Sequence, residues 1–372
     1  MVDGSIEQRF KAAIGRSTQR SMSRTGLFRS VVPVLHDDVP TFMEAPHEHD
    51  APDSDVIVFG FPYEGIRARD TRTLIEPGVP LENTLYARDG AGQAPDWIRR
   101  NALHYSLVQG PGLYAYELDP EFCVAEHISI SDAGNLPIDL EVPAAELMHE
   151  SSDRILERLG AERVPIILGG DDITPYVGLR TVSRQRQTRI AVIKFDAHFD
   201  LCWEPRYWAG SAWARSMEAG YLDPSNLAII GVRGFRNPAF FGEVARELGV
   251  SWWTVTDVAR NGMQACVRAA IERACDGADY LYLSFDVDVM DPAYLPAQKY
   301  PEPAGLTSRE AVAGVRTAVL EGPPLCGADI DCLAPAYDCN GLGGQLAARL
   351  MVEAIAACAY KRAGRSVSAT QP

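Results

Sequence analysis

Acidic side chains and one imidazole follow three apolar segments of this 372-residue chain, and their spacing could do chemistry. RIAVIKF leads into DAHFD, YLYLSF leads into DVDVMDP, and VPIIL leads into GGDDITPY. Alternate residues of an extended segment point the same way, so the acids of each group can converge on one point. The residues concerned are Asp196, His198 and Asp200 in the first group, Asp286 and Asp288 in the second, and Asp171 and Asp172 in the third.

This combination of residue types favours a metal centre. So many carboxylates in one place are tolerable mainly around cations, because a buried charge needs a partner. Oxygen ligands together with one imidazole suit Mn²⁺ or a similar divalent ion, in a site for one ion or for two. A single Asp could instead cap a helix or shape a turn. That explanation fits any one pair of acids better than it fits all three groups together.

The elements that must position these residues alternate along the chain. Apolar runs predict strands, and segments of helical period between them predict helices, which together indicate an α/β fold with one mostly parallel sheet covered on both faces. Ligands of such sheets bind at the carboxyl ends of the strands. We expect strands at 55–61, 127–131, 164–168, 189–195, 226–232, 280–285 and 324–330, and helices at 143–159, 238–249, 262–276, 307–321 and 342–363.

Domain organisation follows from the same pattern. We expect an N-terminal arm at 1–54, one large domain at 55–364 and a C-terminal tail at 365–372. Residues 8–29 are rich in Arg and Ser and contain no acid. Two interpretations of them stay open: an arm that packs on a neighbouring subunit, which we favour, and a transit peptide.

Composition excludes several classes of function. The formal net charge of −15 argues against nucleic-acid binding, because the phosphate backbone requires a basic surface. No apolar run approaches the ~20 residues of a membrane span, so we expect no membrane association. The eight cysteines are scattered without a CxxC pair. They predict reduced core cysteines and a cytoplasmic protein.

Several motifs resemble the signatures of the ureohydrolase family, which includes the arginases and agmatinases. DAHFD and SFDVDVMDPAYLP carry the resemblance most strongly, and PEPAGLTSRE, PAYD, FGFPYEG and GAGQAPDWIR add to it. The resemblance spans roughly residues 55–360. It implies a three-layer α/β/α sandwich, an assembly of trimers or hexamers, and a centre of up to two Mn²⁺ ions, or Ni²⁺ in some relatives. It also implies hydrolysis of a guanidinium group.

Carried over by position, the resemblance makes one set of residues metal ligands, and it also marks three departures. GGDDI replaces the family's GGDH followed by Ser, so that Asp172 stands where the family has a ligand His. Ala209 stands at a His of the loop after DAHxD, and Cys332 stands at the Glu that grips the guanidinium. The implied ligands are Asp172, Asp196, His198, Asp200, Asp286 and Asp288.

Two neighbours of this set also matter. Asp331 is one residue from the missing Glu, and strand alternation predicts that it points to the other face. The loop AQKYPEP stands where the family usually reads GTGTPEP, which places Lys299 and Tyr300 near the mouth of the site. Five carboxylates exceed the charge of two divalent ions, so we expect Lys299 to reach into the acidic cluster as a compensating charge. Trp203, Trp208 and Trp213 cluster around the altered loop. They could line a pocket for a flat cation, but we favour packing at a subunit interface or under the loop.

Two functions within this family remain open, beside the less favoured alternative of a binding or scaffold protein unrelated to hydrolysis. The first is a degenerate subunit that supports an intact ureohydrolase paralogue in a mixed trimer or hexamer, acting on small cationic guanidine- or biguanide-type compounds. In this respect the chain resembles the paired subunits of biguanide-degrading enzymes such as metformin hydrolase. The second is a competent Mn²⁺ or Ni²⁺ amidinohydrolase with altered specificity. We favour the first because three chemical positions have changed, which leaves no residue that we assign as catalytic.

Overall fold

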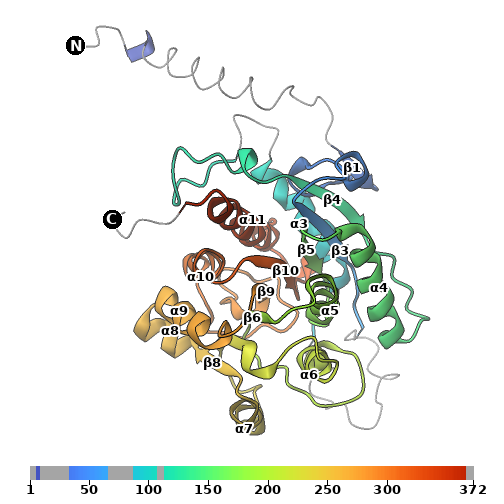
Figure 1. Cartoon of the computed structure of the whole chain (residues 1–372), viewed down its shortest axis with the longest axis vertical. Coiled ribbons are helices and arrows are strands. Elements are labelled where there is room, and N and C mark those ends of the chain that lie inside the picture. Colours follow the sequence, from blue (N-terminus) through green and yellow to red (C-terminus); the bar gives the residue numbers. More distant parts are fainter. Residues whose placement is uncertain (1–5, 9–32, 66–86, 107–112, 366–372) are drawn as a thin grey trace.

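A computed structural model describes residues 6–8, 33–65, 87–106 and 113–365 of the chain. In this part of the chain, eight parallel strands form one sheet in the order β4-β3-β5-β10-β9-β6-β7-β8. The predicted sandwich is confirmed, with helices on both faces of the sheet (Figure 1). The strands are β3 Val56–Phe61, β4 Ile130–Asn135, β5 Val164–Gly169, β6 Ile190–Phe195, β7 Leu227–Val232, β8 Ser251–Thr254, β9 Tyr280–Asp286 and β10 Leu325–Asp331.

Two hydrophobic clusters cover the two faces of the sheet. One lies under α3, α9, α10 and α11, and the other lies under α4, α5, α6 and α7. Ile193 and Phe195 of β6 join the first cluster, whereas Ile190 and Val192 join the second, because strand side chains alternate between faces. The helices are α3 Ala94–Ala102, α4 Ala144–Leu159, α5 Thr174–Arg186, α6 Ala212–Glu218, α7 Ala239–Leu248, α8 Val255–Asn261, α9 Met263–Ala274, α10 Ser308–Glu321 and α11 Leu342–Arg362.

Each predicted strand and helix has a counterpart in the structure. The largest shift is at 127–131, where β4 begins at Ile130 and runs on to Asn135. The prediction omitted β8, a four-residue edge strand whose residues are all half-buried. Helix α10 begins with a capping box in which Thr307 and Glu310 satisfy each other's backbone amides.

Helix α11 is long and apolar enough to cross a membrane by length and composition alone. However, 78% of its most apolar window is buried inside the fold, as in the core helix of a globular domain. It packs against α10 and α3. All eight cysteines are free thiols, five of them buried.

The last part of the predicted arm packs on the domain itself. β1 Val34–His36 and β2 Val39–Pro40 form a small antiparallel hairpin, and Phe42 and Met43 are fully buried in the core. The backbone amide of Phe42 donates to Asp132 of β4, whose carboxylate also pairs with the buried Arg99 at 2.8 Å. Residues 1–5 and 9–32 of that arm lie outside the described residues, as does most of the tail.

Candidate metal centre

Four neighbouring strands deliver the predicted residues to one place. β5, β10, β9 and β6 lie side by side at the centre of the sheet, and all of them run in the same direction. Their carboxyl ends therefore meet, as expected for a parallel sheet. Three groups of potential ligands result, each with its donor atoms within 4.8 Å of one another: Asp196, His198 and Asp288; Asp172, Asp196 and Asp200; and Asp286, Asp331 and Cys332.

Short turns hold the acids in place. Asp286 ends β9 and accepts a hydrogen bond from the backbone amide of Asp288 at 2.7 Å. Asp196 follows β6 and accepts one from the amide of His198 at 2.5 Å. Asp288 in turn accepts the amide of Ala197 at 3.2 Å, which ties the two strand ends together. The Asp-x-Asp and Asp-x-His spacings thus build an Asx-type turn at each strand end.

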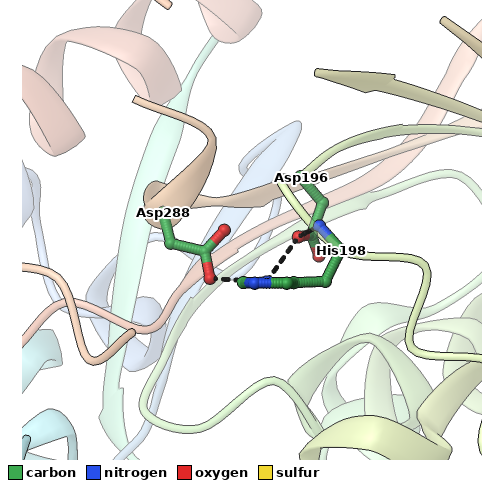
Figure 2. Close-up of side chains that lie close together, drawn as sticks. All are labelled: Asp196, His198 and Asp288. Carbon is green, nitrogen blue, oxygen red and sulfur yellow. Dashed lines mark hydrogen bonds and ion pairs between the residues drawn. The ribbon is translucent and has the colours of Figure 1, made fainter. Parts of the chain in front are cut away.

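His198 lies between two carboxylates (Figure 2). Its Nδ1 is 3.1 Å from Asp288 Oδ2 and 3.5 Å from Asp196 Oδ1. Burial disfavours the imidazolium, but Asp288 and Asp196 outweigh it and raise the pKa of His198 well above its ordinary value. Burial likewise works to raise the pKa of Asp288, but His198 outweighs it and lowers that pKa. Without a metal ion these groups form a charged pair.

Lys194 lies in the group formed by Asp172, Asp196 and Asp200. Its Nζ is 2.6 Å from Asp196 Oδ2, 2.6 Å from Asp200 Oδ2 and 4.0 Å from Asp172 Oδ2, and its side chain has no exposed surface. Burial opposes the ammonium, yet these three carboxylates raise the pKa of Lys194 well above its ordinary value. The motifs of the sequence did not predict a role for Lys194. Its spacing could have indicated that role. Lys194 lies two residues before Asp196 and four before His198, so on an extended strand all three side chains point to the same side.

Asp331 and Cys332 both reach the centre, and the prediction that Asp331 points to the other face is wrong. A carboxylate oxygen of Asp331 and the sulfur of Cys332 lie within 4.8 Å of each other and of Asp286. Strand β10 ends at Asp331, and Cys332 has a positive φ of 60°. That left-handed residue breaks the alternation on which the prediction depended.

Lys299 is buried beside the centre, but its ion pairs join Asp171, a strand-end acid outside the implied ligand set, and Glu64. Its Nζ is 3.3 Å from Asp171 Oδ2 and 3.6 Å from Glu64 Oε1. Glu64 belongs to FGFPYEG and also accepts the backbone amide of Gly90 at 2.9 Å. The ammonium that lies among the predicted ligands is that of Lys194. Lys194 therefore supplies the compensating positive charge that the sequence pattern assigned to Lys299.

Burial raises the pKa of the remaining acidic groups of the centre. Burial is the main cause that raises the pKa of Asp172, with Lys194 opposing and Asp331 reinforcing it. Burial and Asp288 raise the pKa of Asp286 well above its ordinary value, and burial and Asp286 do the same for Asp331. Burial also raises the pKa of the Cys332 thiol well above its ordinary value. Protons or metal ions must therefore neutralise this side of the centre.

Unsatisfied atoms test whether a metal ion fits. Among the described residues, His198 Nε2 and both carboxylate oxygens of Asp172 and of Asp331 are buried without a hydrogen-bond partner. Buried polar atoms are rarely left so unless something coordinates them. Asp196, His198 and Asp288 supply two carboxylates and one imidazole, a donor set that suits Mn²⁺. The group around Asp172 fits less well, because Lys194 already lies between its carboxylates.

A pocket opens in front of His198. Trp208 and the altered position Ala209 lie in its wall, while Trp213 is fully buried below and Trp203 is 69% exposed. The three tryptophans therefore have three different environments. The lining residues are His198, Asp200, Cys202, Trp208, Ala209, Gly210, Arg236, Asn237, Phe241 and Tyr300.

Two of the remaining motifs support the centre from outside. Arg233 donates to the carbonyls of Asp288 at 2.7 Å and of Pro303 at 3.0 Å, which joins the metal-ligand loop to PEPAGLTSRE. A Cβ at Gly305 of that motif would lie 2.4 Å from the backbone of Met290 and Asp291, so only glycine fits there. Asp338 of PAYD accepts the amides of Gly343 and Gly344 and thereby caps α11.

Comparison with known proteins places these features in one family. The sequence model of the family described as the Arginase family matches residues 74–357 of this chain. The chain is similar to proclavaminate amidinohydrolase of Streptomyces clavuligerus, with 28% identity over 337 residues that cover 88% of this chain and 95% of the relative. The solved structure of that amidinohydrolase aligns with a TM-score of 0.70 and 27% identity, covering 87% of this chain and 98% of its own.

Two further proteins extend the comparison. Guanidinopropionase of Pseudomonas aeruginosa is 29% identical over 283 residues, which cover 74% of this chain and 83% of the relative. Trypanosoma cruzi formiminoglutamase, solved with Mn²⁺, aligns with a TM-score of 0.69 and covers 87% of this chain and 99% of its own. At 19% identity, this last likeness concerns the fold.

Proposed function

Because the chain belongs to the arginase family, we propose that it is a ureohydrolase-type subunit of a metal-dependent hydrolase that acts on C–N bonds of guanidine- or biguanide-type compounds. We further propose that its own site has lost catalytic groups and that it supports an intact paralogous subunit. The observation that carries this proposal is the chemistry of two positions: Ala209 in the pocket wall offers no imidazole, and Cys332 beside Asp286 in the acidic centre offers no carboxylate.

Proton transfer is the function that the pocket lacks. A general acid or base works best with a pKa near the working pH. Burial raises the pKa of Cys202 to about 12, and burial raises the pKa of Tyr300 well above its ordinary value, so both stay protonated at neutral pH. Asp200 is engaged by Lys194 at 2.6 Å. His198 also lines the pocket, but in this proposal it is a ligand of the metal ion, so no lining residue among those described remains for acid–base work.

Metal binding remains compatible with this role. Asp196, His198 and Asp288 would hold a divalent ion, which when bound supplies Lewis-acid chemistry. Hydrogen bonds from backbone amides to the carboxylates of Asp196, Asp286 and Asp288 hold these ligands in position. Mn²⁺ and Ni²⁺ are both candidates, since the ligand types admit either ion.

The surface beside the pocket supports the proposed assembly into trimers or hexamers. Phe235 and Phe240 adjoin the lining residues Arg236 and Phe241 in sequence, and their exposed fractions are 104% and 54%. Exposed aromatic side chains are enriched where subunits meet. A neighbouring subunit that covered them would contact the segment that contributes Arg236 and Phe241 to the pocket, which would link assembly to the site.

The test compares the chain alone with the mixed complex. We expect the chain, loaded with Mn²⁺ or Ni²⁺, to hydrolyse agmatine, guanidine and biguanides no faster than its His198→Ala variant. Mixed with the ureohydrolase paralogue of the same genome, it should co-elute with that protein and raise its turnover. Turnover by the chain alone that disappears in His198→Ala would overturn the proposal.

One observation favours the alternative of a competent amidinohydrolase with altered specificity. Arg236 lines the pocket, stacks on the Tyr300 ring at 4.9 Å and has no ion-pair partner among the described residues. A free guanidinium suits a carboxylate. The substrate would then be a guanidino acid, with its cationic end at the acids and its anionic end at Arg236. Hydrolysis of 3-guanidinopropionate, with a KM that rises at least tenfold in Arg236→Ala, would favour this alternative.

A further inference from the structure

We propose that the Lys194 ammonium permanently takes the place of one of two cations in the acidic centre, so that each chain binds one divalent ion. This inference goes beyond the proposed function, because it would hold for an active subunit as well as for an inactive one. It concerns Lys194, which is not one of the predicted ligands and to which the family resemblance assigns no role.

The contacts of Lys194 are those of a cation in a ligand cage. Its Nζ lies 2.6 Å from an oxygen of Asp196 and 2.6 Å from an oxygen of Asp200, with Asp172 at 4.0 Å. The same three carboxylates form one of the groups whose donor atoms are close enough to hold a metal ion. The ammonium therefore already uses the oxygens on which an ion in that group would depend.

Lys194 has no route out of this position. It lies inside β6, one residue before the end of the strand, and its side chain has no exposed surface. The ring of Trp213, itself fully buried, lies 5.1 Å from Nζ. A divalent ion added beside the ammonium would place two like charges together where no water screens them, which is strongly unfavourable.

Asp196 divides the centre between the two cations. Its Oδ2 faces Lys194 at 2.6 Å, whereas its Oδ1 lies 3.5 Å from the imidazole of His198. In the group of Asp196, His198 and Asp288, the carboxylate of Asp288 faces His198 at 3.1 Å, and the ion pairs of Lys194 reach Asp196 but not Asp288. This group is therefore the part of the centre that is left for a metal ion, and one carboxylate serves both cations.

The experiment counts metal ions per chain on the full-length protein. The protein is saturated with Mn²⁺, desalted and analysed by elemental mass spectrometry, and its electron paramagnetic resonance spectrum separates isolated from coupled Mn²⁺. We expect about one Mn²⁺ per chain with an isolated-ion spectrum in the wild type, and about two with a coupled spectrum in Lys194→Met.

Lys299→Met is the matched control. Lys299 is also a fully buried lysine between two acids, Glu64 and Asp171, but it lies outside the ligand groups. Its loss should leave the count at the wild-type value. Lys194→Gln provides a second neutral variant, with a polar side chain that can still hydrogen-bond if Lys194→Met folds poorly.

Three results would overturn the proposal. They are two Mn²⁺ ions per wild-type chain, no ion in the wild type, and an unchanged count in both folded Lys194 variants. None of these results depends on hydrolysis, so a failure here is distinguishable from a failure of the proposed function, which is measured as turnover.

Discussion

The two sides of the acidic centre have similar carboxylates but obtain their positive charge differently. Around His198, the acids Asp196 and Asp288 face an imidazole that can give up its proton to a metal ion. Around Lys194, Asp196 and Asp200 face an ammonium that belongs to the strand itself. Ligand-type residues alone therefore do not define a metal site, because a cation supplied by the chain can satisfy them equally well.

The largest effect is expected from a substitution on the His198 side of the centre. His198→Ala removes the only imidazole of the three ligand groups, and we expect Mn²⁺ binding to fall from about one ion per chain to nearly none, since imidazole loss weakens such sites severely. Elemental analysis after desalting measures this. His149→Ala is the control, because that histidine forms a hydrogen bond with Tyr176 and belongs to none of the three ligand groups. Full occupancy in His198→Ala would mean that the ion binds elsewhere.

Breaking the Lys194 side should cost stability instead. In chelator, Lys194→Met leaves Asp196 and Asp200 buried without their cation, which we expect to lower the free energy of unfolding by about 3–5 kcal/mol. Added Mn²⁺ should restore part of that loss. Urea unfolding followed by circular dichroism measures both quantities.

A surface pair provides the scale for that measurement. Arg268 and Glu321 pair at 2.8 Å, but both are about half exposed, so Arg268→Ala should cost under about 1 kcal/mol. If the two variants unfolded alike, the Lys194 contacts would contribute nothing beyond those of a solvated ion pair.

The pH dependence of binding sharpens the comparison further. The pKa of His198 is raised in the metal-free chain, so the imidazole is protonated at neutral pH and must lose that proton to bind an ion. Mn²⁺ affinity should therefore rise with pH, by up to about tenfold per unit for one released proton. Titration calorimetry in buffers of different ionisation enthalpy measures the proton count. An affinity that does not change between pH 6 and 8 would contradict a protonated His198.

The metal-free chain should show the opposite trend. A group whose folded-state pKa is raised stabilises the fold fully below its unfolded pKa, which is about 6.5 for histidine, and that contribution is lost as pH rises through the folded value. The His198–Asp288 pair should thus weaken with rising pH in chelator. Thermal unfolding with and without Mn²⁺ across this pH range would reveal the crossing trends.

The smallest expected effect is that of restoring the two lost groups. Ala209→His with Cys332→Glu should not produce agmatinase activity, because Lys194 remains among the ligands and Lys299 and Tyr300 still differ from the family's loop. Urea release from agmatine measures this. Robust hydrolysis by the double variant would show that the loop and the ammonium matter less than the two substituted positions.

Much of this fold follows from local sequence pattern. The apolar runs of β5, β6 and β9 are buried along nearly their whole length, so pattern alone locates them. The prediction omits β8 because SWWT is short and half-buried. It misplaces the start of β4 because ISDAGN is largely polar. Such edge elements depend on what packs beside them.

The centre was predictable only in part. The spacing of the strand-end residues predicts their role, since Asp196, His198 and Asp200 occur at every second position. The role of Lys194 depends on Asp172 and Trp213, which come from other parts of the chain, and a lysine late in an apolar run ordinarily extends toward solvent. The position of Asp331 depends on the positive φ of Cys332, which no residue type announces.

The placement of Lys194 inside β6 also bears on how the protein is made. The four strands of the centre span residues 164–331, so its acids come together only when distant segments pair. A tethered ammonium arrives with β6 at that moment, at an effective concentration that no dissolved ion matches. Folding of the sheet can therefore proceed when metal ions are scarce, and loading of the remaining ion becomes a later and separate step.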